Sequence, residues 1–594
     1  EKRNFQTEHG DTVRPWTQGV RNLRERYKPM NIFDDMKTKI AEKVADAFGA
    51  AVKAGELSGD NIDINGKIKL EVPKDKTHGD FACNLAMMLA KPLRCAPRKI
   101  AEAIVSHIAE DEDIAKTEVA GAGFINFYLT PNWLYKVMED IEERGTDYGK
   151  IDLGEGKKVM VEFVSANPTG PMHMGNARGG ALGDCLASVL EYAGYDVTRE
   201  FYVNDAGNQI EKFGNSLNAR YIQELKGEDA IEFPEDGYHG DDIKEHAKAF
   251  IALYGDKYLN VSEDERKAAL VDYALEKNVT ALREDLEKYR IVYDVWFRES
   301  KLHRDGEVMA AIDKLRGNGY TYEEDGALWL NCEKMGLEKN EVLIRKNGIP
   351  TYFAADIAYH INKLETRGYD WAINIWGADH HGHVARMKKA LEAVNIDSSR
   401  LDVVLMQLGR LMQGGEVVRM SKRTGKAITL SDLLEDISVD AARFFFNMRS
   451  AGSHLDFDLT LAAQQNNDNP VYYVQYAYAR ICSILRLLAE DGITVKNYSD
   501  INPSLLCEEA ELNLLKRLCD LPDEIKMSAE SLEPARITRY IMELATDFHS
   551  FYNSCRVKGE DEELMAARLK LIDSVRIVMK GVLGMLKITA PEKM

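Results

Sequence analysis

The stretch from residue 159 to residue 203 constrains the fold most, because it combines a strand pattern, a helix pattern and a second strand pattern. A largely apolar run from Val159 to Val164 is typical of a buried strand, and a second strand-like run extends from Val197 to Val203. Between them, apolar residues recur at helical spacing at Leu182, Leu186, Val189, Leu190 and Ala193. Gly194 follows, where a helix commonly ends. This order predicts a βαβ unit and hence a parallel sheet.

The turn between the first strand and the helix is rich in small residues. It contains Pro168, Gly170, Pro171, His173 and Gly175. At this place in a doubly wound fold, small residues let a nucleotide approach the backbone, and the N-terminus of the next helix favours phosphate. The pattern predicts a Rossmann-like α/β sheet with a nucleotide site, although a Gly/Pro turn with a chance histidine fits the same residues.

Length, charge and cysteine usage bound the class of protein. At 594 residues the chain is too long for one core, so we expect two to four domains. A formal net charge of −20 argues against a protein that is basic all over and leaves nucleic-acid binding to a local basic patch. The eight cysteines include no C-x-x-C pair, so neither zinc nor a disulfide framework is indicated. Scattered thiols fit a reducing cytoplasm, and no apolar run is long enough to span a membrane.

Two short motifs resemble the signatures of class I aminoacyl-tRNA synthetases. His173-Met174-Gly175-Asn176 resembles the HIGH signature, and the residues before it, Ser165 to Pro171, are similar to the arginyl-tRNA synthetase form. Arg419 to Lys426 (RMSKRTGK) resembles the KMSKS loop, with Lys422 at the important lysine. Cations on such a loop offset the charge that builds up on a leaving pyrophosphate. Either motif alone also fits a bland turn or surface loop, but the pair favours the synthetase interpretation.

The resemblance implies which residues handle ATP. The catalytic residues would be His173 and Asn176, which contact the triphosphate, and Lys422, which contacts the pyrophosphate. The ATP-binding set comprises Gly170, His173, Gly175, Asn176, Gly377, Asp379, Met420, Ser421 and Lys422. Asn176 replaces the usual second histidine of the signature, so it can donate a hydrogen bond but does not titrate near neutral pH. Magnesium would arrive with ATP, and no metal held by the protein is expected.

Two later segments also resemble arginyl-tRNA synthetases. They are Gly348 to His360 (GIPTYFAADIAYH) and Trp376 to His383 (WGADHHGH). By this resemblance, Glu162 and Asp356 would pair with a substrate guanidinium. The remaining arginine-binding residues would be Asn167, Tyr352 and His380. A guanidinium is a planar fork of donors that pairs bidentately with carboxylates, and two acidic groups would disfavour neutral side chains.

Other interpretations of these residues stay open. Glu162 could be a surface carboxylate on a strand, and Tyr352 could be a core residue. The histidines at 380, 381 and 383 could form a metal cluster, which is disfavoured because no acidic or cysteine partner lies at a matching spacing. Asn204 to Gln209 (NDAGNQ) ends the second strand, where a site is favoured over a bland loop.

The first 129 residues divide by composition. Residues 1–29 are polar and carry a basic run from Arg21 to Lys28, so we expect an extension that is disordered. Residues 30–129 predict a small α/β domain, which the resemblance makes a tRNA-contacting domain. In it, Ile40, Val44, Phe48 and Val52 share one helix face. Two more helices are expected, the second starting at Pro97, and the strand-like runs are 68–72 and 124–129.

Residues 130–440 form the predicted catalytic domain. A charged, helical insertion at about residues 211–300 separates its halves. Further strand-like runs at 342–359, 371–376 and 401–408 extend the parallel sheet to about five strands.

Residues 441–594 have helical patterns throughout and predict an all-α anticodon-binding domain. Asn469 and Pro470 are typical of a helix cap and first turn, and they open a tyrosine-rich helix. The resemblance implies tRNA contacts at Asn469, Tyr473, Tyr476, Tyr552 and Met594. Aromatic rings stack on unpaired bases at about 1–3 kcal/mol per base, although any one tyrosine would equally suit helix packing.

The resemblance covers residues 30–594 in family order and implies an arginine–tRNA ligase of bacterial type. Such an enzyme would activate L-arginine with ATP, release pyrophosphate and transfer arginine to the terminal adenosine of the arginine tRNA. We expect a cytoplasmic monomer whose partners are tRNA, arginine and ATP, with no membrane. Two alternatives are another class I synthetase, against which Glu162 and Asp356 argue, and a non-catalytic tRNA-binding relative, against which His173 and Lys422 argue.

Overall fold

The computed structural model describes residues 32–58, 62, 64, 67–73, 75–418, 428–559 and 561–594. The predicted extension and the second signature, Arg419 to Lys426, lie outside the described residues. The chain forms two compact units. One comprises the residues up to 150 together with 487–523 and 547–578, and the other comprises 151–486, 524–546 and 579–594. Among the described helices, none has both the length and the apolar character needed to span a bilayer.

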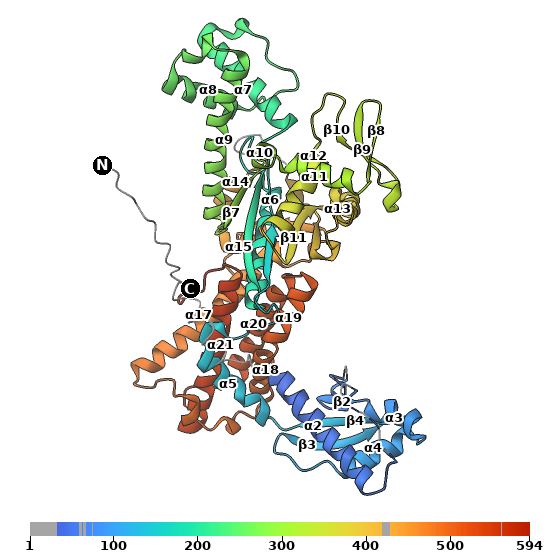
Figure 1. Ribbon diagram of the computed structural model, residues 1–594. Coiled ribbons are helices and arrows are strands. Elements are labelled where there is room, and N and C mark those ends of the chain that lie inside the picture. The colour runs from blue at the N-terminus through green and yellow to red at the C-terminus, as the bar shows by residue number, and fades with distance from the viewer. Residues whose placement is uncertain are drawn as a thin grey trace, which may run out of the picture. The chain divides into compact units, whose positions relative to one another are not determined.

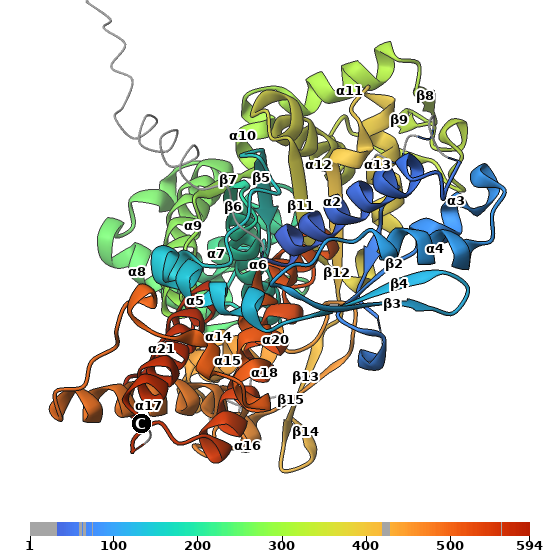
Figure 2. The same cartoon turned by 90° about the horizontal axis from the view of Figure 1, so that it is seen from below.

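The first unit begins with a small α/β domain. Its antiparallel sheet has the order β1-β2-β4-β3, formed by Leu70–Glu71, Phe81–Cys83, Phe124–Leu129 and Ile114–Ala120. Helices α2 (Ile32–Lys53), α3 (Leu85–Leu93) and α4 (Pro97–Ser106) accompany it (Figures 1 and 2). The predicted helix face is largely buried, and both Pro97 and β4 lie where expected. Of the run 68–72, only two residues form a strand, and Val72 is exposed.

The rest of the first unit is helical. Helix α5 (Asn132–Arg144) packs against α18 (Glu509–Cys519). The buried hydroxyl of Tyr135 donates to the Leu506 carbonyl (3.0 Å), and that of Tyr148 donates to the Leu518 carbonyl (2.9 Å). Four long helices contribute residues to both units: α17 (Pro470–Glu490), α19 (Leu521–Ser531), α20 (Ala535–Ser554) and α21 (Glu562–Met585).

The second unit is built on a five-stranded parallel sheet in the order β12-β11-β5-β6-β7. Its strands are Leu401–Met406, Trp371–Gly377, Lys158–Glu162, Asp196–Val203 and Val295–Arg298. The crossover helix α6 (Gly175–Tyr192) joins β5 to β6 and ends just before Gly194, whose φ of +88° suits glycine. This confirms the predicted βαβ unit and the Rossmann-like class.

Helices cover both faces of the parallel sheet. Helix α6 lies on the face of Arg199, because its Asp184 accepts from the Arg199 guanidinium (2.9 Å). On the other face, α10 (Glu299–Arg304), α11 (Glu307–Gly317), α12 (Tyr352–Ile361) and α13 (His381–Ala393) share one apolar core with Phe297 and Ala372 of the sheet (Figure 1). This three-layer arrangement brings the carboxyl ends of the strands to one edge, where α/β folds bind ligands.

The predicted strand run at 342–359 is wrong beyond its first residues. Strand β10 (Glu341–Ile344) is short, and it belongs to an antiparallel sheet with β9 (Ala327–Leu330) and β8 (Thr321–Glu324). Gly348, with φ of +80°, and Pro350 interrupt the apolar run. Thr351 then caps α12, since its hydroxyl accepts from the Ala354 N–H (3.4 Å).

Two further expectations need correction. The insertion is helical in α7 (Asn208–Lys226), α8 (Asp241–Tyr254) and α9 (Glu263–Lys288), but its last residues form β7, the edge strand of the parallel sheet. The C-terminal part is not helical throughout, because β15 (Leu455–Asp458) pairs with β13 (Gly409–Gln413), which also pairs with β14 (Glu416–Val418). Both missed strands are four residues long, too short for a clear period of two.

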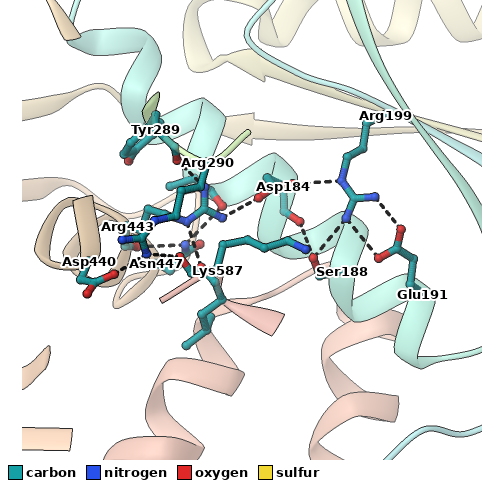
Figure 3. Close-up of polar contacts among 12 residues, drawn as sticks. Asp184, Ser188, Glu191, Arg199, Tyr289, Arg290, Asp440, Arg443, Asn447 and Lys587 are labelled. Carbon is teal, nitrogen blue, oxygen red and sulfur yellow. Dashed lines mark hydrogen bonds and ion pairs between the residues drawn. The ribbon is translucent and has the colours of Figure 1, made fainter. Parts of the chain in front are cut away.

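A buried polar cluster ties α6 to the segment that follows α21. Asp184 of α6 accepts from Arg199 and also from Arg443 Nη2 (2.5 Å) on α15 (Val439–Asn447) (Figure 3). Arg443 is 0% exposed and donates further to the carbonyls of Tyr289 (3.1 Å) and Leu586 (2.9 Å). One arginine therefore satisfies two buried carbonyls and one buried carboxylate.

Candidate active site

The HMGN segment leads into the crossover helix at the carboxyl edge of the sheet. Helix α6 begins at Gly175, whose N–H donates to His173 Nδ1 (3.0 Å). The His173 side chain is exposed, and Asn176 is half-buried. Because the first N–H groups of a helix lack partners within it and carry its positive dipole end, an anion such as phosphate is favoured here.

The backbone between β5 and this segment is strained. Val164 and Ser165 follow the strand in the left-handed region, with φ of +70° and +43°. The Ser165 hydroxyl compensates by donating to Glu162 Oε1 (2.9 Å) and accepting from the Tyr202 N–H (3.2 Å). Strain of this kind clusters at functional sites, where the surroundings hold an unusual turn in place. Here the turn leads to Asn167, which is exposed.

The residues that follow the second signature, from Ile428 to Leu430, are hydrogen-bonded to the HMGN signature and the residue before it. Met174 N–H donates to the Ile428 carbonyl (3.0 Å), and Leu430 N–H donates to the Met172 carbonyl (2.9 Å). His173 and Thr429 form an isolated antiparallel bridge. Met420, Ser421 and Lys422 themselves lie outside the described residues.

Glu162 is not a surface carboxylate. It ends β5 and is only 6% exposed. Its Oε2 atom accepts from Lys363 Nζ (2.5 Å), and its Oε1 atom accepts from the Ser165 hydroxyl. A buried carboxylate needs such partners, because burial of an unpaired charge is costly.

Asp356 lies on α12 between two histidines. Its Oδ2 atom is 2.6 Å from His383 Nε2, and its Oδ1 atom is 3.2 Å from His360 Nδ1. Burial alone would raise the pKa of the Asp356 carboxyl, but His360 and His383 outweigh it and hold that pKa well below its usual range. His383 therefore contacts a carboxylate, and the described residues contain no group of three or more His, Cys, Asp or Glu side chains suited to a metal.

A continuous polar chain joins the two carboxylates. Lys363 Nζ, bound to Glu162, also donates to Asn374 Oδ1 (2.9 Å). The Asn374 amide nitrogen lies 2.8 Å from His360 Nε2, and His360 reaches Asp356. All three linking side chains are at most 1% exposed. Sequence reasoning missed this chain, and its only signal was a lone asparagine within the apolar run W-A-I-N-I-W.

The other predicted arginine and ATP residues that the structure describes lie on several elements of the second unit. Tyr352 is 42% exposed at the start of α12, so it is not a core residue. Its ring lies against Gly207 of the NDAGNQ segment, where an added Cβ would come within 3.0 Å of the ring. His380 and Asp379 are exposed in a turn directly after Gly377, the last residue of β11. Gly170 is half-buried in the loop before α6.

A cavity of about 350 Å³ opens beside Tyr352 and Gly207. Its lining includes Glu299, a residue that sequence reasoning missed. Glu299 begins α10 and is 3% exposed. Its Oε2 atom accepts from the Asn204 amide nitrogen (3.0 Å), in the amide orientation that gives both the oxygen and the nitrogen of the Asn204 side chain a hydrogen-bond partner. Burial, with the nearby charges of Asp205 and Asp356, raises the pKa of Glu299 to about 7.

Replacing Glu299 by glutamine should change how stability depends on pH. An acid whose pKa is raised from 4.5 to about 7 on folding stabilises the fold at low pH, and that contribution is lost as the pH rises from about 4.5 through 7. Because glutamine cannot ionise, the variant should gain about 3 kcal/mol over the parent at pH 8.5 and only about 1 kcal/mol at pH 5. Urea denaturation at both pH values measures this. Glu365→Gln, at an exposed carboxylate, is the control, and equal pH profiles for Glu299→Gln and the parent would contradict the prediction.

Four of the five predicted tRNA-binding residues belong to the second unit. Asn469 and Met594 both line a cavity of about 740 Å³. Asn469 caps α17 as expected, since its Oδ1 atom accepts from the Val471 N–H (3.2 Å). The Tyr476 ring stacks with Tyr472, while Tyr473 is half-buried on the same helix. Tyr552 belongs to the first unit and is 40% exposed.

Comparison with known proteins covers nearly all of the chain. Three family models match: the arginyl tRNA synthetase N terminal domain over residues 34–129, the class I (R) tRNA synthetase catalytic domain over 139–449, and the DALR anticodon binding domain over 474–594. The arginine–tRNA ligase of Acetivibrio thermocellus is 58% identical over 565 residues, which cover 95% of this chain and 100% of the relative.

Solved structures of arginyl-tRNA synthetases have the same fold as this chain. A Campylobacter jejuni protein assigned as an arginyl-tRNA synthetase has a TM-score of 0.71 at 34% identity, covering 78% of this chain and 100% of that one. Thermus thermophilus arginyl-tRNA synthetase has a TM-score of 0.68 at 22% identity, covering 94% and 100%, and shows the same fold. The chain is therefore a class I aminoacyl-tRNA synthetase, and it belongs to the arginyl-tRNA synthetase family.

Proposed function

We propose that the chain joins arginine to its tRNA by two transfers at the carboxyl edge of the parallel sheet. In the first, a carboxylate oxygen of arginine attacks the α-phosphorus of ATP, and pyrophosphate leaves. In the second, a ribose hydroxyl of the terminal adenosine attacks the carbonyl carbon of the adenylate, and AMP leaves. The first nucleophile is already an anion, so that step needs no enzyme base, and catalysis rests on alignment and charge stabilisation.

ATP, as its magnesium complex, would lie against the N-terminus of α6. In this proposal His173 and Asn176 contact the triphosphate, and Lys422 contacts the leaving pyrophosphate. Support comes from the helix N-terminus and from the pairing of Met174 with Ile428, which anchors the described flank of the second signature beside His173. The remaining proposed ATP residues are Gly170, Gly175, Gly377, Asp379, Met420 and Ser421.

The observation that carries the choice of arginine is the pair of buried or half-buried carboxylates, Glu162 and Asp356, joined by one polar chain. Each would accept from the planar guanidinium, which suits bidentate pairing. An apolar neutral side chain would leave the remaining acceptor sites of both carboxylates without donors, so the pocket would discriminate against it. Asn167, Tyr352 and His380 would hold the rest of the amino acid.

The tRNA would be bound by residues outside the parallel sheet. We place anticodon contacts at Asn469, Tyr473, Tyr476, Tyr552 and Met594, and further contacts in the domain of residues 30–129. The shared cavity of Asn469 and Met594 supports the first placement. The proposed domain limits are 30–129, 130–440 and 441–594, with residues 1–29 as an extension. That the enzyme is a cytoplasmic monomer is also part of the proposal and rests on the resemblance and on the scattered cysteines.

Pyrophosphate–ATP exchange tests the function, run with and without arginine and with and without arginine tRNA. Exchange that needs both would support the whole proposal, including a requirement for tRNA during activation. Exchange with arginine alone would keep the ligase and remove that requirement. Exchange with a neutral amino acid, or no exchange by folded protein that binds the tRNA, would favour another class I specificity or a non-catalytic relative.

A further inference from the structure

A row of polar side chains crosses the centre of the parallel sheet. Asn374 of β11 is the register partner of Glu162 in β5, and Glu162 is the register partner of Glu200 in β6. Register partners on neighbouring strands point to the same face, so these three side chains lie side by side. Each is at most 6% exposed. Two carboxylates within one buried row require cations from the layer above them.

The helix layer supplies these partners from one short stretch. Helix α12 continues into a π-helical turn, Asn362–Thr366, and π turns are frequent at functional sites. Lys363 in this turn bonds Glu162 and Asn374, and Arg367 just after it bonds both oxygens of Glu200. The two glutamates therefore have separate cations. Of these two ion pairs, the Lys363–Glu162 pair is the one that hydrogen bonds connect, through Asn374 and His360, to Asp356.

Lys363 is enclosed by its own partners and does not face a substrate directly. It is 0% exposed, two of its contacts are to Glu162 and Asn374, and its ammonium lies 4.0 Å from the centre of the Tyr359 ring. Glu162, in contrast, keeps acceptor capacity. Each carboxylate oxygen has about two acceptor sites, and Lys363 and Ser165 occupy one on each. The two sites that remain match the paired donors of a guanidinium.

We propose that Lys363 is a positioning residue of the arginine pocket, which holds the Glu162 carboxylate in its orientation and, through Asn374 and His360, fixes it relative to Asp356. The inference rests on the proposed function, because it assumes that Glu162 and Asp356 receive the guanidinium. Lys363 acts on the substrate only through Glu162. Its removal therefore affects the binding of arginine and not that of ATP.

Steady-state kinetics of Lys363→Met provide the test, since methionine keeps the length of the side chain without its charge. We expect the KM for arginine to rise about tenfold or more, while the KM for ATP stays within about twofold. Arg367→Met is the matched control, because it removes the cation of Glu200 one strand away. It should lower the melting temperature and leave the KM for arginine unchanged. Folded Lys363→Met with the parental KM for arginine would overturn the proposal.

Two conservative variants decide the matter if Lys363→Met does not fold. Lys363→Arg keeps the charge and should recover most of the arginine affinity. Asn374→Ser removes the Oδ1 acceptor of Lys363 and the link to His360, and should raise the KM for arginine. A parental KM for arginine in folded Asn374→Ser would also overturn the proposal.

Glu162→Gln separates this inference from the proposed function. If Glu162→Gln raises the KM for arginine and Lys363→Met does not, only the role of Lys363 fails. If Glu162→Gln itself leaves the KM for arginine unchanged, the arginine pocket is misplaced and both fail.

Discussion

Asp356→Asn should lower kcat/KM for arginine by about two to three orders of magnitude. Removing one partner of a buried charge pair costs about 2–5 kcal/mol, and each 1.4 kcal/mol is about tenfold. Asparagine keeps the size of the side chain but removes the negative charge that would meet the guanidinium. His360 and His383 would then face an amide in place of the carboxylate. The KM for ATP should change little, because Asp356 lies on α12, whereas the triphosphate contacts are proposed at the N-terminus of α6.

Aminoacylation kinetics with arginine and with citrulline, its neutral analogue, measure this effect directly. The parent should discriminate strongly between them, and Asp356→Asn should discriminate less. The matched control is Asp370→Asn, at the amino edge of the same sheet, where the carboxylate accepts from the Lys158 N–H (2.9 Å). It should keep the parental kinetics. Unchanged arginine kcat/KM and unchanged discrimination in Asp356→Asn would contradict the assignment of this pocket.

The parallel sheet could be predicted because its signals are local. The runs at 159–164 and 197–203 are rich in apolar and β-branched residues, although they include Glu162, Arg199 and Glu200, and a helix of regular period lies between them. Both became neighbouring strands. The strand predicted over 342–359 is wrong for a local reason too. It is apolar, but Gly348, Pro350 and the capping Thr351 divide it into a short strand and a helix.

The polar chain in the arginine pocket could not be predicted, because it depends on register. Lys363 and Glu162 are 201 residues apart in sequence. Their contact requires that β5 and β11 pair with Glu162 opposite Asn374, and that the π turn directs the Lys363 side chain toward these two strands. The resemblance supplied Glu162 and Asp356 as substrate contacts, whereas the structure supplies the groups that hold them. Glu299 could not be predicted either, because it follows β7, an edge strand of four residues that has no clear sequence pattern.

Arg443→Met should destabilise the second unit by about 3 kcal/mol or more. Breaking a buried ion pair by removing one partner costs about 3–5 kcal/mol, and here the carbonyls of Tyr289 and Leu586 also lose their donor. Asp184 retains Arg199, which places the effect toward the lower end of that range. Arg290→Met is the matched control. Arg290 also bonds an aspartate, Asp440, but its side chain is 40% exposed, and exposed ion pairs contribute only about 0–1 kcal/mol.

Urea unfolding followed by tryptophan fluorescence distinguishes the two variants. Of the five described tryptophans, Trp296, Trp329, Trp371 and Trp376 lie in the second unit and only Trp133 lies in the first, so the signal reports mainly on the second. We expect a clear fall in the midpoint for Arg443→Met and a small one for Arg290→Met. Equal shifts would contradict a special role for Arg443. A large shift for Arg443→Met alone would mean that the signature helix α6 and the segment after α21 are held together chiefly by one buried guanidinium, and not by the exposed pairs around it.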